Sequence, residues 1–249
     1  ILIYILNNCI EFNFSIYIFK RMKLNWFTLF FISIIFFSCE NKRYQNPNIV
    51  IILTDDQGWG DLSLHGNSNI RTPNLDQIAN NGVRFNRFYV SPVCSPTRAE
   101  LLTGNFFFRS GVNGVTKGYE RMNHDHQLVS DFFKNKSYRT GLFGKWHNGS
   151  QPPYHPNNRG FEEFYGFTSG HWGNYFDPIM EKNGQLTRGE GYITDDITNK
   201  SISFIEKSNS PFFALISFNT PHSPMQVPNS FFEKKEVNLR GRYSKNEDI

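Results

Sequence analysis

The chain has 249 residues, 39% of them hydrophobic, and a formal net charge of +4 at pH 7. This length and apolar content suffice to bury the core of one or two domains. Nucleic-acid-binding proteins usually carry a much larger positive charge, so we expect no nucleic-acid partner. The three cysteines, Cys9, Cys39 and Cys94, are odd in number and widely spaced, which excludes a disulfide framework and a zinc-ligand spacing.

The N-terminal part reads as an export signal with extra sequence before it. Met22 is the first methionine, and Lys23 precedes an apolar run over residues 24–37 that suits a signal-peptide core and is short for a membrane span. The run ends just before Cys39, in a pattern that resembles a bacterial lipoprotein box. A plain signal peptide and an uncleaved anchor are the alternatives. We interpret residues 1–21 as spurious upstream sequence, 22–39 as the signal, 40–47 as a polar linker and 48–249 as the folded domain.

This interpretation predicts an exported protein on the periplasmic side or surface of a bacterial cell. Its contact with the membrane would be a lipid attached to Cys39 and nothing else.

Three apolar runs predict buried parallel strands, at residues 48–53, 138–143 and 212–218. Each run leads into polar residues, and ligands of open α/β sheets bind beyond the carboxyl ends of the strands. Residues 83–90 also look like a strand. Helices are expected from Thr72 to Ala79 with Gly82 as its C-cap, around Leu128 and Phe133, and over residues 193–205.

Asp55 and Asp56 follow the first predicted strand directly. Two adjacent carboxylates repel each other unless a cation lies between them, and their oxygens suit Ca²⁺ or Mg²⁺. The alternative is an ordinary acidic loop in which Asp56 caps the next turn.

A further helix is predicted from Cys94 to Gly104. Ser95 is a good N-cap, Pro96 suits the first helical position, and Gly104 can end the helix. Cys94 then lies at the positive end of the helix dipole, which stabilises a nucleophile's negative charge, and Arg98 can point back to it. The alternative is a small buried thiol.

These segments, taken in order, resemble the type I sulfatases of the alkaline-phosphatase-like superfamily. The resemblance is carried by Asp55-Asp56, Cys94-Ser95-Pro96-Thr97-Arg98, Gly144-Lys145-Trp146-His147 and Thr220-Pro221-His222, and it covers residues 47 to about 240. Asn148 departs from the usual leucine. The resemblance implies a mixed, largely parallel sheet flanked by helices. It also implies that the C-terminal part is missing, because no later metal-ligand pair or second lysine follows His222.

The resemblance further implies a role for each site residue. A formylglycine-generating enzyme would convert Cys94 to an aldehyde whose hydrate attacks sulfur. Asp55, Asp56 and residue 94 would hold Ca²⁺, with Mg²⁺ as the alternative. Arg98 and Lys145 would stabilise the diol and the sulfate, His147 would accept a proton during sulfate release, and His222 would protonate the leaving alcohol.

The function expected from these roles is hydrolysis of sulfate esters, with a sulfated polysaccharide or oligosaccharide as substrate. Three alternatives are a phosphate or phosphonate monoesterase of the same superfamily, a non-catalytic glycan-binding fragment, and a cysteine hydrolase pairing Cys94 with His147. His124, His126 and His155 are interpreted as surface residues and Asp61 as structural. Residues 155–166 are read as scaffold, and residues 169–172 as either a packed loop or part of the substrate pocket.

Overall fold

The computed structural model describes residues 2–5 and 46–231. Residues 2–5 and 48–231 belong to one compact unit. The predicted signal core, the lipoprotein box and Cys39 lie outside the described residues and stay predictions. No helix in the described ranges is long and apolar enough to cross a membrane.

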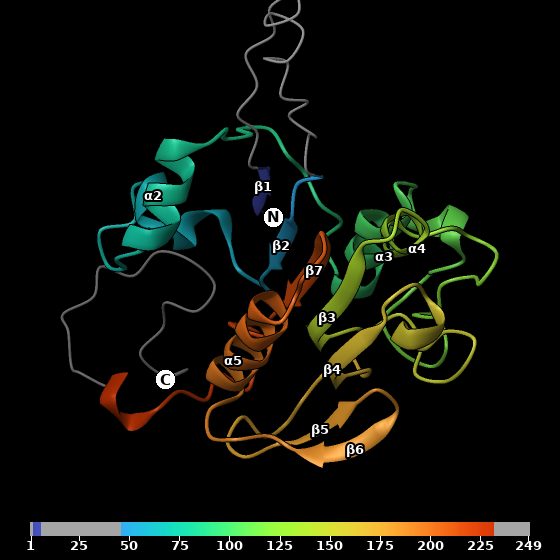
Figure 1. Ribbon diagram of the computed structural model, residues 1–249. Helices are drawn as coiled ribbons and strands as arrows, with labels where there is room; N and C mark the ends of the chain where they lie inside the picture. The colour runs from blue at the N-terminus through green and yellow to red at the C-terminus, as the bar shows by residue number, and fades with distance from the viewer. Residues whose placement is uncertain (1, 6–45, 232–249) are drawn as a thin grey trace, which may run out of the picture. The chain divides into compact units, whose positions relative to one another are not determined.

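A seven-stranded sheet is the centre of the unit, in the order β1-β2-β7-β3-β4-β5-β6 (Figure 1). Strands β2, β7, β3 and β4 run parallel, while β1 is antiparallel at one edge and β5 and β6 form an antiparallel hairpin at the other. The predicted mixed, largely parallel sheet is therefore confirmed. The strands are β1 Leu2–Ile5, β2 Ile49–Leu53, β3 Arg139–Lys145, β4 Glu163–Phe167, β5 Ile179–Lys182, β6 Gln185–Arg188 and β7 Phe212–Ser217.

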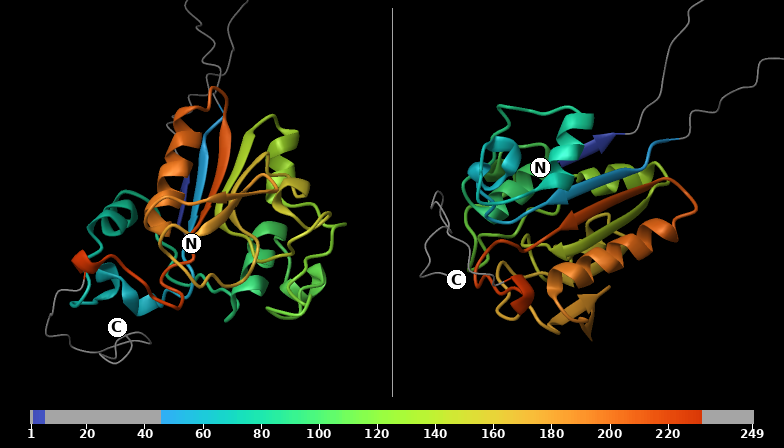
Figure 2. Two further views of the ribbon diagram at one scale, coloured as in Figure 1. Left: turned by 90° about the horizontal axis from the view of Figure 1, so that it is seen from below. Right: turned by 90° about the vertical axis from the view of Figure 1, so that its left-hand side faces the viewer.

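Helices cover both faces of this sheet, as Figure 2 shows. Helix α5 (Ile193–Glu206) packs on one face, while α3 (Cys94–Thr103) and α4 (Val129–Asn135) pack on the other. Strand β7 serves both cores, since Phe213 and Leu215 face α3 and α4 whereas Phe212, Ala214 and Ile216 face α5. This two-sided burial explains why the β7 run is continuously apolar. Helix α2 (Pro73–Asn81) and the short 3₁₀ helices Trp59–Asp61, Ser63–His65, Phe107–Ser110, Pro156–Asn158 and Asn229–Phe231 complete the described elements.

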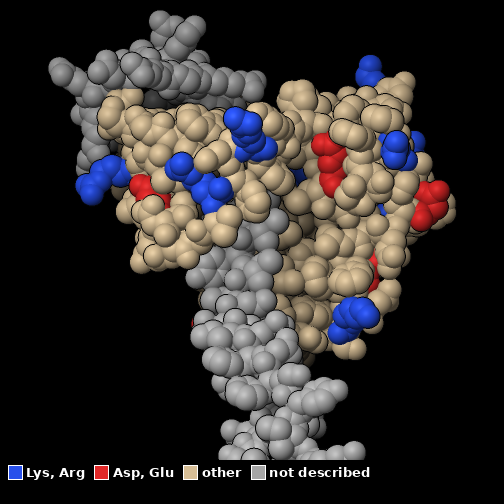
Figure 3. Space-filling view, turned by 90° about the horizontal axis from the view of Figure 1, so that it is seen from above, with Lys and Arg blue, Asp and Glu red and all other residues tan. Residues whose placement is uncertain are grey.

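The surface charge is dispersed on the face shown in Figure 3. Lys and Arg residues lie singly or in small groups there, separated by uncharged residues.

The backbones of the central strands meet closely near their carboxyl ends. A Cβ on Gly166 of β4 would lie 1.9 Å from the Gly144 carbonyl oxygen, and a Cβ on Gly144 would lie 2.0 Å from the Ser217 carbonyl oxygen. Gly144 also has φ +106°, which side chains rarely adopt. These glycines let β4, β3 and β7 converge directly before the polar residues that follow β3 and β7.

Two local predictions are wrong. Residues 83–90 form no strand, and Val83, Phe85, Phe88 and Tyr89 are exposed because no described strand pairs with this segment. Ser95 is not the N-cap of α3, which begins at Cys94 with Val93 as its cap. Ser95 is instead buried, and its hydroxyl donates to the Glu120 carbonyl at 3.2 Å.

Other boundaries were predicted well. Gly104 ends α3 in the left-handed conformation, and its N–H donates to the Glu100 carbonyl. Gly82 follows α2 as its C-cap, but with φ −128° rather than a left-handed angle. The β5–β6 hairpin was not predicted, although its turn, Asn183-Gly184, with φ 49° and 85°, is a strong hairpin signal.

We expect Gly166→Ala to lower the free energy of unfolding by about 2–3 kcal/mol, because the added methyl group must push two paired backbones apart. Urea unfolding of the two proteins measures this difference. Gly60→Ala is the matched control, since a Cβ at Gly60 meets nothing within 4 Å, and its effect should stay within about 0.5 kcal/mol. Equal effects of the two substitutions would contradict the close approach.

Candidate active site

The polar residues that follow β2, β3 and β7 come together at the carboxyl-terminal ends of these parallel strands. The backbone ties the first and last of these loops, because Phe218 N–H donates to the Leu53 carbonyl at 2.8 Å and Asp55 N–H to the Thr220 carbonyl at 3.1 Å. The predicted convergence of the strand ends at a common site is therefore observed.

A buried charged cluster lies at the centre of the site. Lys145 Nζ is 2.6 Å from Asp55 Oδ2, and Arg98 Nη2 is 3.5 Å from Asp55 Oδ1. Lys145, Asp55 and Arg98 are only 1%, 3% and 4% exposed. Two cations thus share one carboxylate away from water, which leaves the cluster with an excess of positive charge.

Arg98 is also held by hydrogen bonds to the ends of two strands. Its Nη1 donates to the Lys145 carbonyl at 2.9 Å and to the Ser217 hydroxyl, which itself donates to the same carbonyl at 2.7 Å. The Nε of Arg98 is buried and has no hydrogen-bond partner within the described part of the chain. The guanidinium is therefore fixed in place with one donor still available.

Burial lowers the pKa of both cations, and the negative charge of Asp55 opposes this shift. The pKa of Lys145 is lowered further by the charge of Arg98. A thiolate at Cys94 raises the pKa of both Arg98 and Lys145. Cys94 thus lies within electrostatic reach of the cluster.

The start of α3 is anchored by Asn148. Its side-chain nitrogen donates to the Ser95 hydroxyl at 3.0 Å and to the carbonyls of Ser95 and Glu120 at 3.2 and 3.3 Å. Asn148 is fully buried. It therefore positions the turn that presents Cys94, a role that sequence reasoning did not assign to it.

His147 is held in one tautomer. Its Nε2 lies 2.8 Å from the Val115 carbonyl, which can only accept, so Nε2 carries the proton and Nδ1 keeps a lone pair. That Nδ1 is buried and without a partner within the described residues. A Cβ on Gly170 would lie 2.1 Å from Nε2, so only glycine leaves room for the ring in this orientation.

Burial, together with the nearby charge of Lys145, lowers the pKa of His147 to about 4. The ring is therefore neutral at pH 7, with a lone pair that can accept a proton.

His222 lies on the loop after β7 and meets Asp56. Its Nδ1 lies 2.7 Å from the Ser223 carbonyl, and its Nε2 is 3.8 Å from Asp56 Oδ2. The buried Tyr175 hydroxyl donates to the His222 carbonyl at 2.7 Å, which fixes the loop. The ring of His171 lies 5.4 Å from that of His222. The loop at residues 169–172 therefore adjoins the site.

The described residues do not by themselves make up a Ca²⁺ site. Asp55 and Asp56 offer carboxylate oxygens of the kind that Ca²⁺ prefers, yet Ca²⁺ takes six to eight oxygen ligands. No group of three or more His, Cys, Asp or Glu side chains suited to a metal occurs in the described ranges. The two aspartates can contribute to a metal site but do not form one by themselves.

Comparison with protein families decides the assignment. The model of the sulfatase family matches residues 47–244. The chain belongs to the sulfatase family.

Curated relatives agree with this assignment. N-acetylgalactosamine-6-sulfatase of Mus musculus is 34% identical over 232 residues, covering 80% of this chain and 44% of that protein. N-acetylglucosamine-6-O-sulfatase of Bacteroides thetaiotaomicron is 36% identical over 192 residues, covering 74% of this chain and 33% of that protein. The chain therefore spans less than half the length of these relatives.

Solved structures share its fold. Ps i-CgsB in complex with k-i-k-neocarrahexaose matches with a TM-score of 0.68 and 32% identity, over 75% of this chain and 48% of that one. A protein in complex with its substrate D-glucosamine-2-N,6-O-disulfate matches with a TM-score of 0.63 and 35% identity, over 72% of this chain and 35% of that one. The phosphonate monoester hydrolase of Agrobacterium radiobacter, at 24% identity and a TM-score of 0.52, shares the fold alone.

The surface prediction is wrong for one histidine. His155 is buried, and its Nε2 lies 2.5 Å from Glu181 Oε1 on the β5–β6 hairpin, a contact that no local pattern reveals. His124 is exposed and His126 partly so, as expected. Asp61 accepts a 2.6 Å hydrogen bond from Gly58 N–H, which agrees with a structural role.

Asn219 is a buried polar residue that the sequence analysis did not single out. Both of its side-chain polar atoms are buried and have no partner within the described residues. It directly precedes the Thr220 carbonyl that accepts from Asp55.

We expect Asp55→Asn to lower the free energy of unfolding by about 3–5 kcal/mol, because it leaves Lys145 and Arg98 buried without a carboxylate. Urea unfolding in the presence of a chelator measures this, so that bound metal does not contribute. Asp56→Asn is the matched control. Its carboxylate is 28% exposed and 3.8 Å from His222, so its loss should cost less than about 1 kcal/mol. Similar losses would show that Asp55 is not the centre of the cluster.

We expect the His147 ring to stay neutral on acidification until pH falls to about 4. Since its folded pKa is below the ordinary value of 6.5, the unfolded chain binds a proton first. The contribution of His147 to the free energy of unfolding is thus fully present above about pH 6.5 and decreases as the pH falls from about 6.5 to about 4. An NMR titration of the ring resonances, assigned with His147→Gln, measures the pKa. A midpoint near 6.5 would contradict the buried environment.

Proposed function

We propose that the protein of which this chain is part hydrolyses sulfate esters of a sulfated polysaccharide or oligosaccharide. The observation that carries the proposal is the buried cluster of Arg98, Lys145 and Asp55 beside Cys94. It has more positive than negative charge and is fixed by strand ends, as a site for a sulfate group requires. Family membership and the sulfated saccharides named for similar proteins support the substrate class.

The proposed nucleophile is a formylglycine made from Cys94 by a formylglycine-generating enzyme. One hydroxyl of its hydrate attacks sulfur, and the sugar oxygen leaves as the S–O bond breaks. The other hydroxyl then loses its proton, the aldehyde re-forms, and sulfate is expelled. A serine at this position would lack the second hydroxyl and would keep its sulfate.

The surrounding side chains have distinct parts in these steps. Arg98 and Lys145 stabilise the charge on the diol and the sulfate oxygens. Neutral His147, with the lone pair of Nδ1 unpartnered, accepts the proton of the second hydroxyl. His222, with Nε2 beside the Asp56 carboxylate, donates a proton to the leaving sugar oxygen. Asp55 and Asp56 would hold Ca²⁺, or Mg²⁺ as the alternative, which when bound neutralises sulfate oxygens.

Mass spectrometry of tryptic peptide 88–98 tests the nucleophile. The full-length protein is co-expressed with a formylglycine-generating enzyme. We expect the peptide to lose about 18 Da, because CHO replaces CH₂SH. The modified protein should cleave sulfate esters in preference to phosphate or phosphonate esters, and Cys94→Ala should abolish this cleavage.

Other outcomes would support the alternatives. An unmodified thiol, when a control sulfatase is converted in the same cells, would favour a non-catalytic glycan-binding protein. Preference for phosphonate esters would assign the site to the related monoesterases. Inactivation by iodoacetamide without dependence on metal would point to a cysteine hydrolase.

A further inference from the structure

Two adjoining cavities lie around the β5–β6 hairpin. The first is next to the site, and the second extends to Arg139 and Glu163 at the starts of β3 and β4. The first, which we call the loop cavity, has a volume of about 450 Å³ and is lined by His171, Trp172, Asn174, Asp177 and Arg188. The second, the basic cavity, has about 510 Å³ and lies between α5, β4 and the hairpin. Arg188 lines both cavities, so they are neighbours.

The loop cavity begins at the candidate active site. His171, one of its lining residues, places its ring 5.4 Å from that of His222. Trp172 is half-buried and stacks on Phe167 of β4 with ring centroids 5.0 Å apart, which fixes the indole beside the cavity. A rigid aromatic surface next to the polar groups of Asn174 and Asp177 suits a sugar ring, which has both apolar and hydroxyl-bearing faces.

The basic cavity carries an excess of positive charge. Its lining includes five cationic side chains, Arg139, Lys182, Arg188, Lys200 and Lys207, and two carboxylates, Glu163 and Glu190. Arg139 pairs with Glu163 at 2.7 Å, and Lys200 pairs with Glu190 at 3.5 Å and with buried Asp196 at 3.7 Å. Lys182, Arg188 and Lys207 form no ion pair with any residue that the structure describes. Three unpaired cations around one cavity would be stabilised by a bound polyanion.

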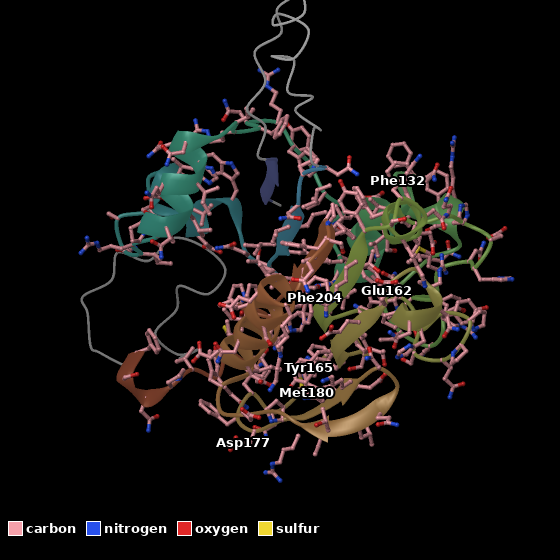
Figure 4. All side chains as sticks on the ribbon, in the orientation of Figure 1. Phe132, Glu162, Tyr165, Asp177, Met180 and Phe204 are labelled. Carbon is pink, nitrogen blue, oxygen red and sulfur yellow. The ribbon has the colours of Figure 1, made fainter. Side chains whose placement is uncertain are left out.

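Neighbouring groups give the basic cavity a fixed wall. Arg139 lies 4.2 Å above the Phe204 ring, and Lys200 lies 5.6 Å from the centre of the Tyr165 ring. The Tyr165 hydroxyl donates to the buried carboxylate of Asp196. Figure 4 labels Tyr165 and Phe204, which line the basic cavity, and Asp177, which lines the loop cavity. Arg188 is the residue that joins the two linings.

We propose that the loop cavity and the basic cavity bind the part of a sulfated glycan chain that extends beyond the reacting sugar, with the unpaired cations contacting its further sulfate groups. The proposal rests on the proposed sulfatase activity and narrows it to substrates several sugars long. The sugar next to the reacting one lies against Trp172. Arg188 contacts the chain where it passes from one cavity to the other.

The test compares a short and a long substrate in the metal-loaded, formylglycine-bearing protein. The variant is the triple substitution Lys182→Ala, Arg188→Ala and Lys207→Ala. We expect its kcat/KM for 4-nitrophenyl sulfate to stay within about twofold of the unsubstituted protein. Its kcat/KM for a sulfated hexasaccharide should fall at least about tenfold, mainly through KM, because binding shared by substrate and transition state is lost. Added salt should also lower the kcat/KM of the triple variant for the hexasaccharide less than that of the unsubstituted protein.

A matched control variant loses the same number of positive charges, but at positions outside the two cavities. Arg71→Ala, Lys134→Ala and Lys136→Ala remove three exposed cations from outside the cavities. This triple variant should cleave the hexasaccharide as the unsubstituted protein does. Equal losses in the two triple variants, or no loss in either, would overturn the proposal.

Calorimetric binding to Cys94→Ala protein separates this proposal from the proposed activity. The hexasaccharide should bind, and its desulfated form and a single-stranded DNA of equal charge should bind at least about tenfold more weakly. Loss of hexasaccharide binding in the cavity variant would support the glycan site even if no sulfate ester were cleaved. DNA binding as tight as that of the hexasaccharide would instead assign the cavity to nucleic acid and overturn the proposal.

Discussion

The contact between Lys145 and the Asp55 carboxylate is the interaction on which the site depends. It joins the residue that ends β3 to the loop after β2 in a region closed to water, and Arg98 adds α3 to the same group. Charges are stable in such surroundings only when each has a partner, so the three elements can adopt few other arrangements. The attraction of both cations to Asp55 holds the three elements together, and the positive charge left over suits the binding of an anion.

The parallel sheet supplies the frame for this cluster. Gly144 and Gly166 let three strand backbones approach one another, and the polar residues follow at once. The two helical layers then bury opposite faces of β7, which keeps the strand ends rigid. Residues that are 119 positions apart in the chain, Arg98 and Ser217, are thereby in hydrogen-bond contact.

Much of this arrangement could be predicted from the sequence, because strands of a parallel sheet that are buried on both faces consist of continuous runs of apolar residues. Asp55, Lys145 and His222 were placed correctly since each follows such a run. The remainder depended on contacts between distant residues. Ser95 looks like a cap but is buried by Asn148 and Glu120, and His155 meets Glu181 of a hairpin whose Asn-Gly turn was overlooked. Residues 83–90 have strand-like composition without a described partner strand.

The backbone conformation at the strand ends limits which amino acids can be exchanged there during evolution. Asp56 and His147 have φ angles of 61° and 67°, a left-handed conformation that glycine adopts at the least cost, although aspartate, asparagine and histidine adopt it more often than other side chains do. Folding alone would favour glycine at both positions. Under the proposed function, the stability of the fold and the chemistry favour different residues there, so a related protein that has lost the activity is expected to carry glycine at these positions.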